Sequence, residues 1–234
     1  MPQKNSIKIY IQDGYYHLYN RGVERRDIFR DTEDYKVFLR FLKDALLPPP
    51  DRTILMKSFT LKGATFKGIP RRNKNFFGQI ELLAYSLMPN HFHLLVHQIV
   101  PRVIDQFIRS ICTRYSMYFN KKYKRNGTLF QGIYKASLIT EDPYLLHLSR
   151  YIHRNPLKYT EDLRNAYSSY GEYLGIRKTE WIKPALILSF FQPGKLPFLK
   201  HINSYQKFVE YENKKETLFE WYLDGSITLE DDDE

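Results

Sequence analysis

The sequence predicts an α+β sandwich, an antiparallel β-sheet with helices packed on it. Three observations favour this fold class. β-Prone segments and segments with apolar residues at helical spacing follow one another in the order strand, helix, two strands, helix, strand, helix. Only two residues separate the two middle strands, which makes them an antiparallel hairpin. Hydrophobic residues make up 43% of the 234 residues and aromatic residues 16%, which is enough to close a sizeable core and excludes a largely disordered chain.

The first strand is expected over residues 15–20, because this β-prone segment ends at the punctuating pair Arg21-Gly22. A helix follows, for which either Asp31 or Thr32 can serve as the N-cap. The three prolines at 48–50 must end it. Its apolar residues at helical spacing are Tyr35, Phe38, Leu39 and Leu42.

Residues 51–77 contain short β-prone pieces around glycines and a proline, which predicts a basic hairpin or a flexible excursion. The middle strands are expected over residues 80–88 and 91–97, with the turn at Pro89-Asn90. The pattern over residues 102–123 suits a long helix with a basic outer face, ended by Asn126-Gly127.

Another strand is expected over residues 129–139, and a helix that starts with Asp142 as its cap and Pro143 in its first turn. Pro156 lies just beyond the end of that helix. We therefore divide the chain into a main domain over residues 1–175, with 51–77 as a basic insertion, and a C-terminal extension over 176–234 that ends in an acidic tail.

The chain carries a net charge of +10, and removing the five acidic residues 230–234 raises it to +15. Seven basic residues and no acidic one lie between Arg52 and Lys74, and six and none lie between Arg109 and Arg125. Aromatic residues interleave with both runs, a pattern that favours a nucleic-acid partner over a merely solvated basic surface. The single Cys112 excludes an internal disulfide, and no apolar run reaches the length of about 18 residues that spans a bilayer. We expect a soluble, cytoplasmic protein without a membrane partner.

The tripeptide His91-Phe92-His93 is the most informative candidate site. Side chains alternate along a strand, so the two histidines project to one face, about 6.5 Å apart along the chain, while Phe92 enters the core. Two imidazoles on one face can share a divalent cation, although an isolated His-x-His is often incidental. His97 lies about 13 Å further along the strand and is expected at an edge or on the surface.

A second candidate is the pair Tyr151 and Asn155, which lie four residues apart and share a helix face. The amide oxygen of Asn155 could complete a metal site begun by the histidines, beside which the Tyr151 phenol could attack a phosphodiester. Such an attack would leave a covalent phosphotyrosine, so that a later 3′-hydroxyl could reverse the step. The alternative is a helix C-terminus at which Asn155 caps and Tyr151 packs. Tyr115 and Tyr118 rank below Tyr151 as nucleophiles, because they have no metal ligand at helical spacing, and are read as core or base-stacking residues.

With these motifs the sequence resembles the REP-associated tyrosine transposases, which belong to the single-tyrosine HUH transposases related to insertion-sequence transposases. The resemblance extends over about residues 14–175 and is carried by the segments 16–22 (YHLYNRG), 87–96 (LMPNHFHLLV), 118–120 (YFN), 127–132 (GTLFQG), 150–156 (RYIHRNP) and 168–170 (SSY). It implies an HUH fold of the ferredoxin-like sandwich type over residues 1–175, dependence on Mg²⁺ or Mn²⁺, and cleavage and joining of single-stranded DNA next to imperfect hairpins.

By this resemblance His91 and His93 match metal ligands, Asn155 the third ligand and Tyr151 the nucleophile. The DNA contacts expected from the resemblance and from the basic segments are Asn20, Arg21, Arg109, Arg114, Lys121, Lys122, Lys124, Arg125 and Lys135, with the 51–77 insertion also holding backbone. Two features depart from the family pattern: Ile133 stands where relatives carry arginine, and the 51–77 insertion is longer than usual.

The sequence thus predicts a metal-dependent endonuclease and strand transferase, a transposase that nicks single-stranded DNA through a 5′-phosphotyrosine. Two alternatives stay open: a domesticated hairpin-binding protein without transposition, and a nickase of the replication-initiator type. The expected partners are REP-like palindromes, and the expected location is the cytoplasm, in association with the nucleoid. A monomer is favoured over a dimer. The acidic tail is read as a solubilising end, with competition for the basic groove as the alternative.

Overall fold

The computed structural model describes residues 10–51, 55–70, 73–192 and 202–210. Its main sheet has the strand order β4-β5-β1-β6, with every neighbouring pair antiparallel. The strands are β1 (Gly14–Arg21), β4 (Ile80–Met88), β5 (His91–Gln98) and β6 (Lys135–Ile139). The long helices are α1 (Thr32–Leu46), α2 (Val103–Lys122) and α3 (Asp142–Arg154). This confirms the predicted α+β sandwich.

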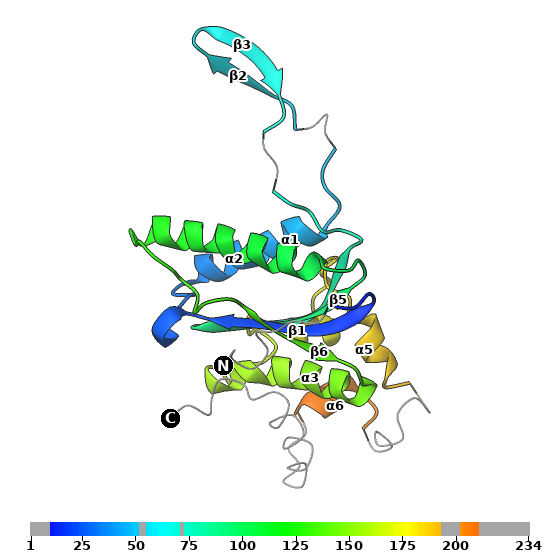
Figure 1. Ribbon diagram of the computed structural model, residues 1–234. Coiled ribbons are helices and arrows are strands. Elements are labelled where there is room, and N and C mark those ends of the chain that lie inside the picture. Colours follow the sequence, from blue (N-terminus) through cyan, green and yellow to red (C-terminus); the bar gives the residue numbers. More distant parts are fainter. Residues whose placement is uncertain (1–9, 52–54, 71–72, 193–201, 211–234) are drawn as a thin grey trace.

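The two faces of the sheet are covered by different helices (Figure 1). Tyr16 and Leu18 on β1 belong to one buried cluster, which holds the apolar faces of α1 and α2. Leu95 on β5 and Ile139 on β6 belong to a second cluster with α3. The alternation of side chains along each strand therefore separates an α1–α2 layer from an α3 layer.

Helix α1 begins where Asp31 caps it, which settles the choice between Asp31 and Thr32. The Asp31 carboxylate accepts hydrogen bonds from the backbone of Glu33 and Asp34, as an N-cap does. The helix ends at Leu46, just before the prolines. α1 is joined to α2 by the buried Asp34, whose carboxylate lies 2.7 Å from Lys122 Nζ and accepts from the hydroxyls of two α2-side tyrosines, Tyr118 and Tyr123.

Residues 51–77 contain the predicted hairpin, formed by β2 (Lys57–Leu61) and β3 (Ala64–Gly68). It makes its own two-stranded sheet, separate from the main one. The short elements that complete the chain are the 3-10 helices η1 (Val23–Arg25) and η2 (Asn155–Lys158) and the helices α4 (Tyr170–Tyr173), α5 (Ala185–Ser189) and α6 (Tyr205–Glu210). Among the described helices, none is long and apolar enough to cross a bilayer.

Two sequence-based expectations were wrong in detail. The strand predicted over residues 129–139 is restricted to β6, because positive φ angles at Gly127 and Gly132 turn the chain and leave only an isolated bridge from Phe130 to Gly22. The N-cap of α3 is Glu141 rather than Asp142, so Asp142 occupies the first turn with Pro143. The acidic Asp142 still lies at the positive end of the helix dipole.

The described part of the range 176–210, which the sequence sets apart as an extension, packs onto α3 and the sheet. Ile182 forms a parallel bridge with Leu82 on β4, and Ile187 and Phe208 are buried in the α3 cluster. Tyr205 on α6 contacts His153 on α3, with 2.6 Å between the hydroxyl and Nδ1. The acidic tail, residues 230–234, lies outside the described residues.

One buried histidine of α3 predicts how stability depends on pH. His147 packs against the ring of Phe208, and burial, reinforced by the nearby Arg150 charge, lowers its pKa to about 4. Because this folded-state pKa lies below the ordinary value of 6.5, the stabilising contribution is present above pH 6.5 and is lost as the pH falls towards 4. Replacing His147 by leucine should therefore remove about 2 kcal/mol of the stability loss between pH 7 and pH 5. Urea unfolding of both proteins at the two pH values measures this, and an equal loss in both would contradict it.

Candidate active site

His91 and His93, the first two of the three histidines of β5, project from the sheet face that α3 covers. His91 and His93 have ring centroids 5.1 Å apart and nearly perpendicular rings, while Phe92 between them is fully buried in the α1–α2 cluster. The alternation expected from the sequence is therefore confirmed. His97 lies further along the same strand, where it stacks on Tyr15 and pairs with Glu81, so it is apart from the other two.

A third histidine, which sequence reasoning did not assign to the site, orients His93. His17 on β1 lies 2.8 Å from His93, measured from Nε2 to Nδ1, and the two rings stack at 5.0 Å. Burial lowers the pKa of His17 to about 3 and that of His93 well below its ordinary value, so both imidazoles are neutral at pH 7. Nε2 of His93 is buried and has no hydrogen-bond partner. A neutral imidazole whose second nitrogen is held by a neighbour has the arrangement found in metal-binding histidines.

His91 is oriented by the turn that precedes it. Its Nδ1 lies 2.5 Å from the side-chain oxygen of Asn90. An amide oxygen can only accept, so Nδ1 of His91 is the donor in this bond. Asn90 of the turn and His17 of the neighbouring strand thus hold the imidazoles of His91 and His93 in defined orientations.

Tyr151 comes to these imidazoles from α3. Its half-buried ring lies 5.6 Å from the ring of His93 and perpendicular to it, and 6.5 Å from the ring of His17. Asn155 is buried at the C-terminal end of α3, where its side-chain amide donates to the backbone carbonyl of Tyr151 at 3.4 Å. The structure therefore brings His91, His93 and Tyr151 together, and it links Asn155 to the residue that carries the phenol.

The donor set defines which metal could bind. No group of three His, Cys, Asp and Glu side chains suited to a metal ion occurs in the described parts of the chain. A cation held by His91 and His93 would need an oxygen as third protein ligand, which the Asn155 amide can provide. The amide oxygen and the positions left for phosphate oxygens suit Mn²⁺ or Mg²⁺, whereas the two imidazoles suit a transition metal better than Mg²⁺. The orphaned Nε2 of His93 fits such a role.

Two of the expected DNA contacts lie beside the imidazoles. Arg21 is the register partner of His91, and its Nε donates to Gln131 at 2.5 Å. Lys135 on β6 places its Nζ 5.7 Å from the ring centre of Tyr19, which itself stacks on His17. Both cations therefore lie to one side of the candidate metal site, Arg21 on β1 next to β5 and Lys135 on β6 beyond it.

The other expected contacts lie along α2 and beyond its end. Arg114 packs over Phe41 and donates to its carbonyl, and Lys122 pairs with Asp31 and Asp34, so these two side chains join α1 to α2 in the structure. Their role in DNA binding stays a prediction. Lys121 and Lys124 are exposed, Arg109 is exposed beside Asp105, and Arg125 contacts Asn120 and the ring of Phe119.

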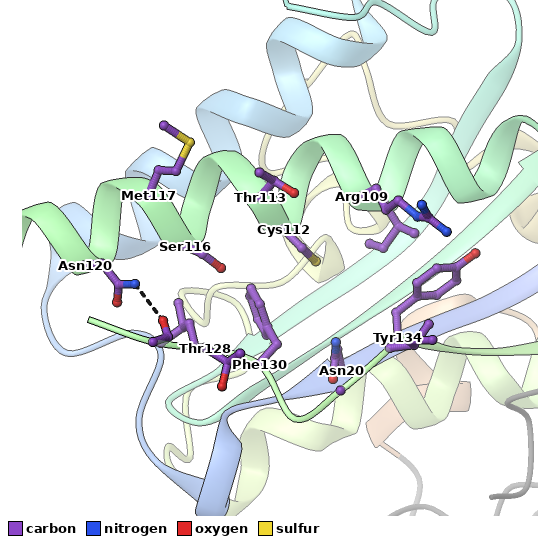
Figure 2. Close-up of a pocket in the computed structure, with 15 residues that line it drawn as sticks. Asn20, Arg109, Cys112, Thr113, Ser116, Met117, Asn120, Thr128, Phe130 and Tyr134 are labelled. Atoms are coloured by element: carbon purple, nitrogen blue, oxygen red, sulfur yellow. Dashed lines mark hydrogen bonds between the residues drawn. The ribbon is translucent and has the colours of Figure 1, made fainter. Parts of the chain in front are cut away.

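A pocket of about 600 Å³ lies on the opposite side of the sheet from the imidazoles, between α2 and residues 127–134. Figure 2 shows Arg109 and Met117 of α2 above it and Phe130 and Tyr134 below, with the buried Asn20 of β1 at its floor. Ile133, which the sequence resemblance marks as a departure from the expected family pattern, lines this pocket and is 71% exposed. Of the expected DNA contacts, Asn20 and Arg109 belong to this pocket rather than to the imidazole site.

Comparison with known proteins shows a similarity to transposases. The model of the family described as "Transposase IS200 like" matches residues 67–155, the segment that contains β4, β5, α2 and α3 with both imidazoles, the phenol and Asn155. Among solved structures, a REP-associated tyrosine transposase bound to a REP hairpin is 12% identical and covers 77% of this chain and 98% of its own, with a TM-score of 0.49. A protein of Deinococcus radiodurans R1 described as a candidate transposase is 16% identical and covers 66% and 97%, with a TM-score of 0.35. No curated protein matches the chain.

The likeness over the segment that carries β5 and α3 supports a DNA-processing enzyme of the transposase class. Residues 67–155, 89 of the 234 residues of this chain, are similar to the IS200-like transposases.

Proposed function

We propose that this transposase cleaves and joins single-stranded DNA next to a hairpin through a covalent bond to Tyr151, with Mg²⁺ or Mn²⁺ held by His91, His93 and Asn155. The observation that supports it most strongly is the approach of the Tyr151 ring to His93, between residues 58 positions apart in the sequence. A phenol beside two neutral imidazoles with lowered pKa values is typical of a functional site rather than of a packed core.

The residues divide the chemistry among them. Tyr151 loses its phenolic proton and attacks the phosphorus; the tyrosine oxygen–phosphorus bond forms, the bond from phosphorus to the 3′-oxygen breaks, and that oxygen takes up a proton. The divalent cation would supply polarisation of the phosphodiester and stabilisation of the leaving oxygen. Attack by another 3′-hydroxyl on the phosphotyrosine reverses the step, which makes the reaction strand transfer rather than hydrolysis.

The surroundings of the site suit a phosphate backbone. Lys135 and Arg21 place positive charge beside the imidazoles, and Lys158, just after Asn155, acts electrostatically on His93. Together with the positive charge of the chain, these groups would hold DNA by contacts that weaken as salt rises.

The test is a covalent-adduct assay. The full chain is incubated with a labelled single-stranded oligonucleotide that folds into a hairpin with an unpaired flank, with Mn²⁺ or with a chelator. We expect a protein–DNA band that survives denaturation and depends on the metal. Hairpin binding without any such band would favour the domesticated hairpin-binding protein instead.

His17 supplies a more specific prediction. Replacing it by phenylalanine keeps a ring against Tyr19 but removes the nitrogen that holds His93 Nδ1. Loss of a residue that orients a metal ligand typically lowers metal affinity about 10- to 100-fold. The adduct should therefore need correspondingly more Mn²⁺ to reach half its maximum, with DNA binding unchanged. An unaltered Mn²⁺ dependence would assign His17 to packing alone.

A further inference from the structure

The β2–β3 hairpin, residues 57–68, has no role in the candidate active site described above. It pairs with no other strand of the described chain, and Figure 1 shows it projecting from the α1–α2 side, on the far side of the sheet from α3. A two-stranded ribbon alone in water is marginally stable. Some of its residues should therefore stabilise the ribbon, and others should serve its function.

One face of the ribbon stabilises the ribbon itself. Phe59 and Phe66 lie directly opposite each other, with ring centroids 5.8 Å apart and rings nearly parallel. A cross-strand aromatic pair of this kind contributes about 0.2–1 kcal/mol. Leu61 lies on the same face next to the turn.

The other face is polar and offers hydrogen bonds outward. In the register of the ribbon it presents Ser58, Thr60, Thr65 and Lys67, with the hydroxyls of the opposed Thr60 and Thr65 3.2 Å apart. These side chains are exposed. Hydroxyl groups both donate and accept, so they can pair with either kind of group on a base edge or with phosphate.

The charge of the ribbon has one sign. Lys57, Lys62 and Lys67 are all exposed, and no acidic residue occurs between Asp51 and Glu81 in the sequence. Lys62 lies in the two-residue turn with a φ of 49°, followed by Gly63 at 82°. A positive φ disfavours a residue that carries a Cβ atom, and turns of this type prefer asparagine, aspartate or glycine. A lysine at this position puts a positive charge at the tip at some conformational cost.

We propose that the β2–β3 ribbon is an arm that enters the major groove of the duplex stem of a DNA hairpin, with its hydroxyl face on the base edges and its lysines on the phosphates. The dimensions agree, because five extended residues span about 17 Å, and a major groove about 12 Å wide admits a two-stranded ribbon. The single sign of charge matches a polyanion. This inference rests on the proposed function for its substrate, and it assigns stem recognition to a surface separate from the site of cleavage.

The test compares two DNA probes and two variants of the full chain. One probe is a hairpin with a stem of about ten base pairs, one helical turn, and the other is an unpaired strand of equal length. The first variant combines Lys57→Gln, Lys62→Gln and Lys67→Gln. The matched control combines Lys178→Gln, Lys183→Gln and Lys207→Gln, three exposed lysines outside the ribbon.

The ribbon variant should bind the hairpin at least about tenfold more weakly in 0.1 M salt, and the slope of log affinity against log salt should fall by about 0.9 for each lost phosphate contact. Its affinity for the unpaired strand should be unchanged, and the control should bind both probes as the unaltered protein does. Equal weakening on both probes, an equal effect of the control, or no weakening at all would overturn the proposal.

A second variant tests the hydroxyl face. Thr60→Val with Thr65→Val keeps the β-branched shape and the charge, so the salt slope should stay the same while preference among stem sequences decreases. An unchanged preference would exclude base reading by this face. This test does not depend on the cleavage chemistry. If no phosphotyrosine forms but the lysine variant binds the hairpin more weakly and the unpaired strand normally, the proposed function is refuted and the proposed role of the ribbon is still supported.

Discussion

Replacing Tyr151 by phenylalanine is expected to abolish the denaturant-resistant protein–DNA band and to leave hairpin binding nearly intact. The change removes one oxygen from a ring that is half-buried against His93, and the phenyl ring can keep that contact. The oxygen is the atom that would form the bond to phosphorus, and no other atom of the side chain can replace it. Adduct formation should therefore drop below detection, while the affinity measured by fluorescence anisotropy should change less than about twofold, because uncharged side chains contribute little to phosphate binding.

Tyr118→Phe is the matched control for this experiment. Tyr118 is the rival that the sequence leaves on the basic helix, and in the structure its hydroxyl donates to the buried Asp34 on the α1–α2 side of the sheet. Its loss should lower the free energy of unfolding by about 1 kcal/mol, with no effect on the adduct. A persisting adduct in the Tyr151 variant, or its disappearance in the Tyr118 variant, would refute the assignment of the nucleophile.

How far the sequence predicts the site depends on how local its geometry is. The common face of His91 and His93 follows from strand alternation alone, and the helix that carries Tyr151 and Asn155 follows from its proline-marked ends. For this reason the sequence places the candidate residues on a hairpin and on a distant helix, which are the elements that carry them in the structure. That the helix lies over the imidazole face is a tertiary fact, which the sequence predicts only through the family resemblance.

His17 shows where local reasoning stops. Its contact with His93 depends on the register between β1 and β5, which pairs Tyr19 with His93 and leaves His17 one step along the same face. Residues 76 positions apart acquire this register from the packing of both strands, not from any turn between them. The sequence does show that His17 shares a strand face with Tyr15 and Tyr19. It does not show which residue of β5 lies next to His17, because that depends on the register.

The strand predicted over residues 129–139 was wrong in the segment from Gly127 to Tyr134 for a different reason. Its composition is β-prone, but positive φ at two glycines bends it away from the sheet, and Leu129 and Phe130 are buried under α2 instead of extending β6. The same bend forms one wall of the pocket beneath α2. Propensity is overridden here by turn conformation and by burial.

Replacing His93 by glutamine should remove the metal-dependent reaction. His93 is buried, its Nδ1 is held by His17 and its Nε2 has no protein partner, so a bound cation would be the group that satisfies that nitrogen. We expect adduct formation to decrease at least about 100-fold at a fixed Mn²⁺ concentration, since the loss of a ligand should exceed the effect of losing its supporting residue. Binding of Mn²⁺ itself, followed by the decrease of the free-ion signal in electron paramagnetic resonance, should weaken in parallel.

His97→Gln is the control, because His97 lies on the same strand and the same face but pairs with Glu81 and stacks on Tyr15, away from Tyr151. His91→Gln is a second test at a less buried position, where a fold-destabilising effect is smaller. If the His91 and His93 variants melt as the unaltered protein does and still bind Mn²⁺ and form the adduct, the metal site is not on β5. If all three variants lose the reaction equally, the effect belongs to the strand as a whole and not to His91 and His93. Loss confined to His91 and His93 would locate the cation where the phenol of Tyr151 can meet it.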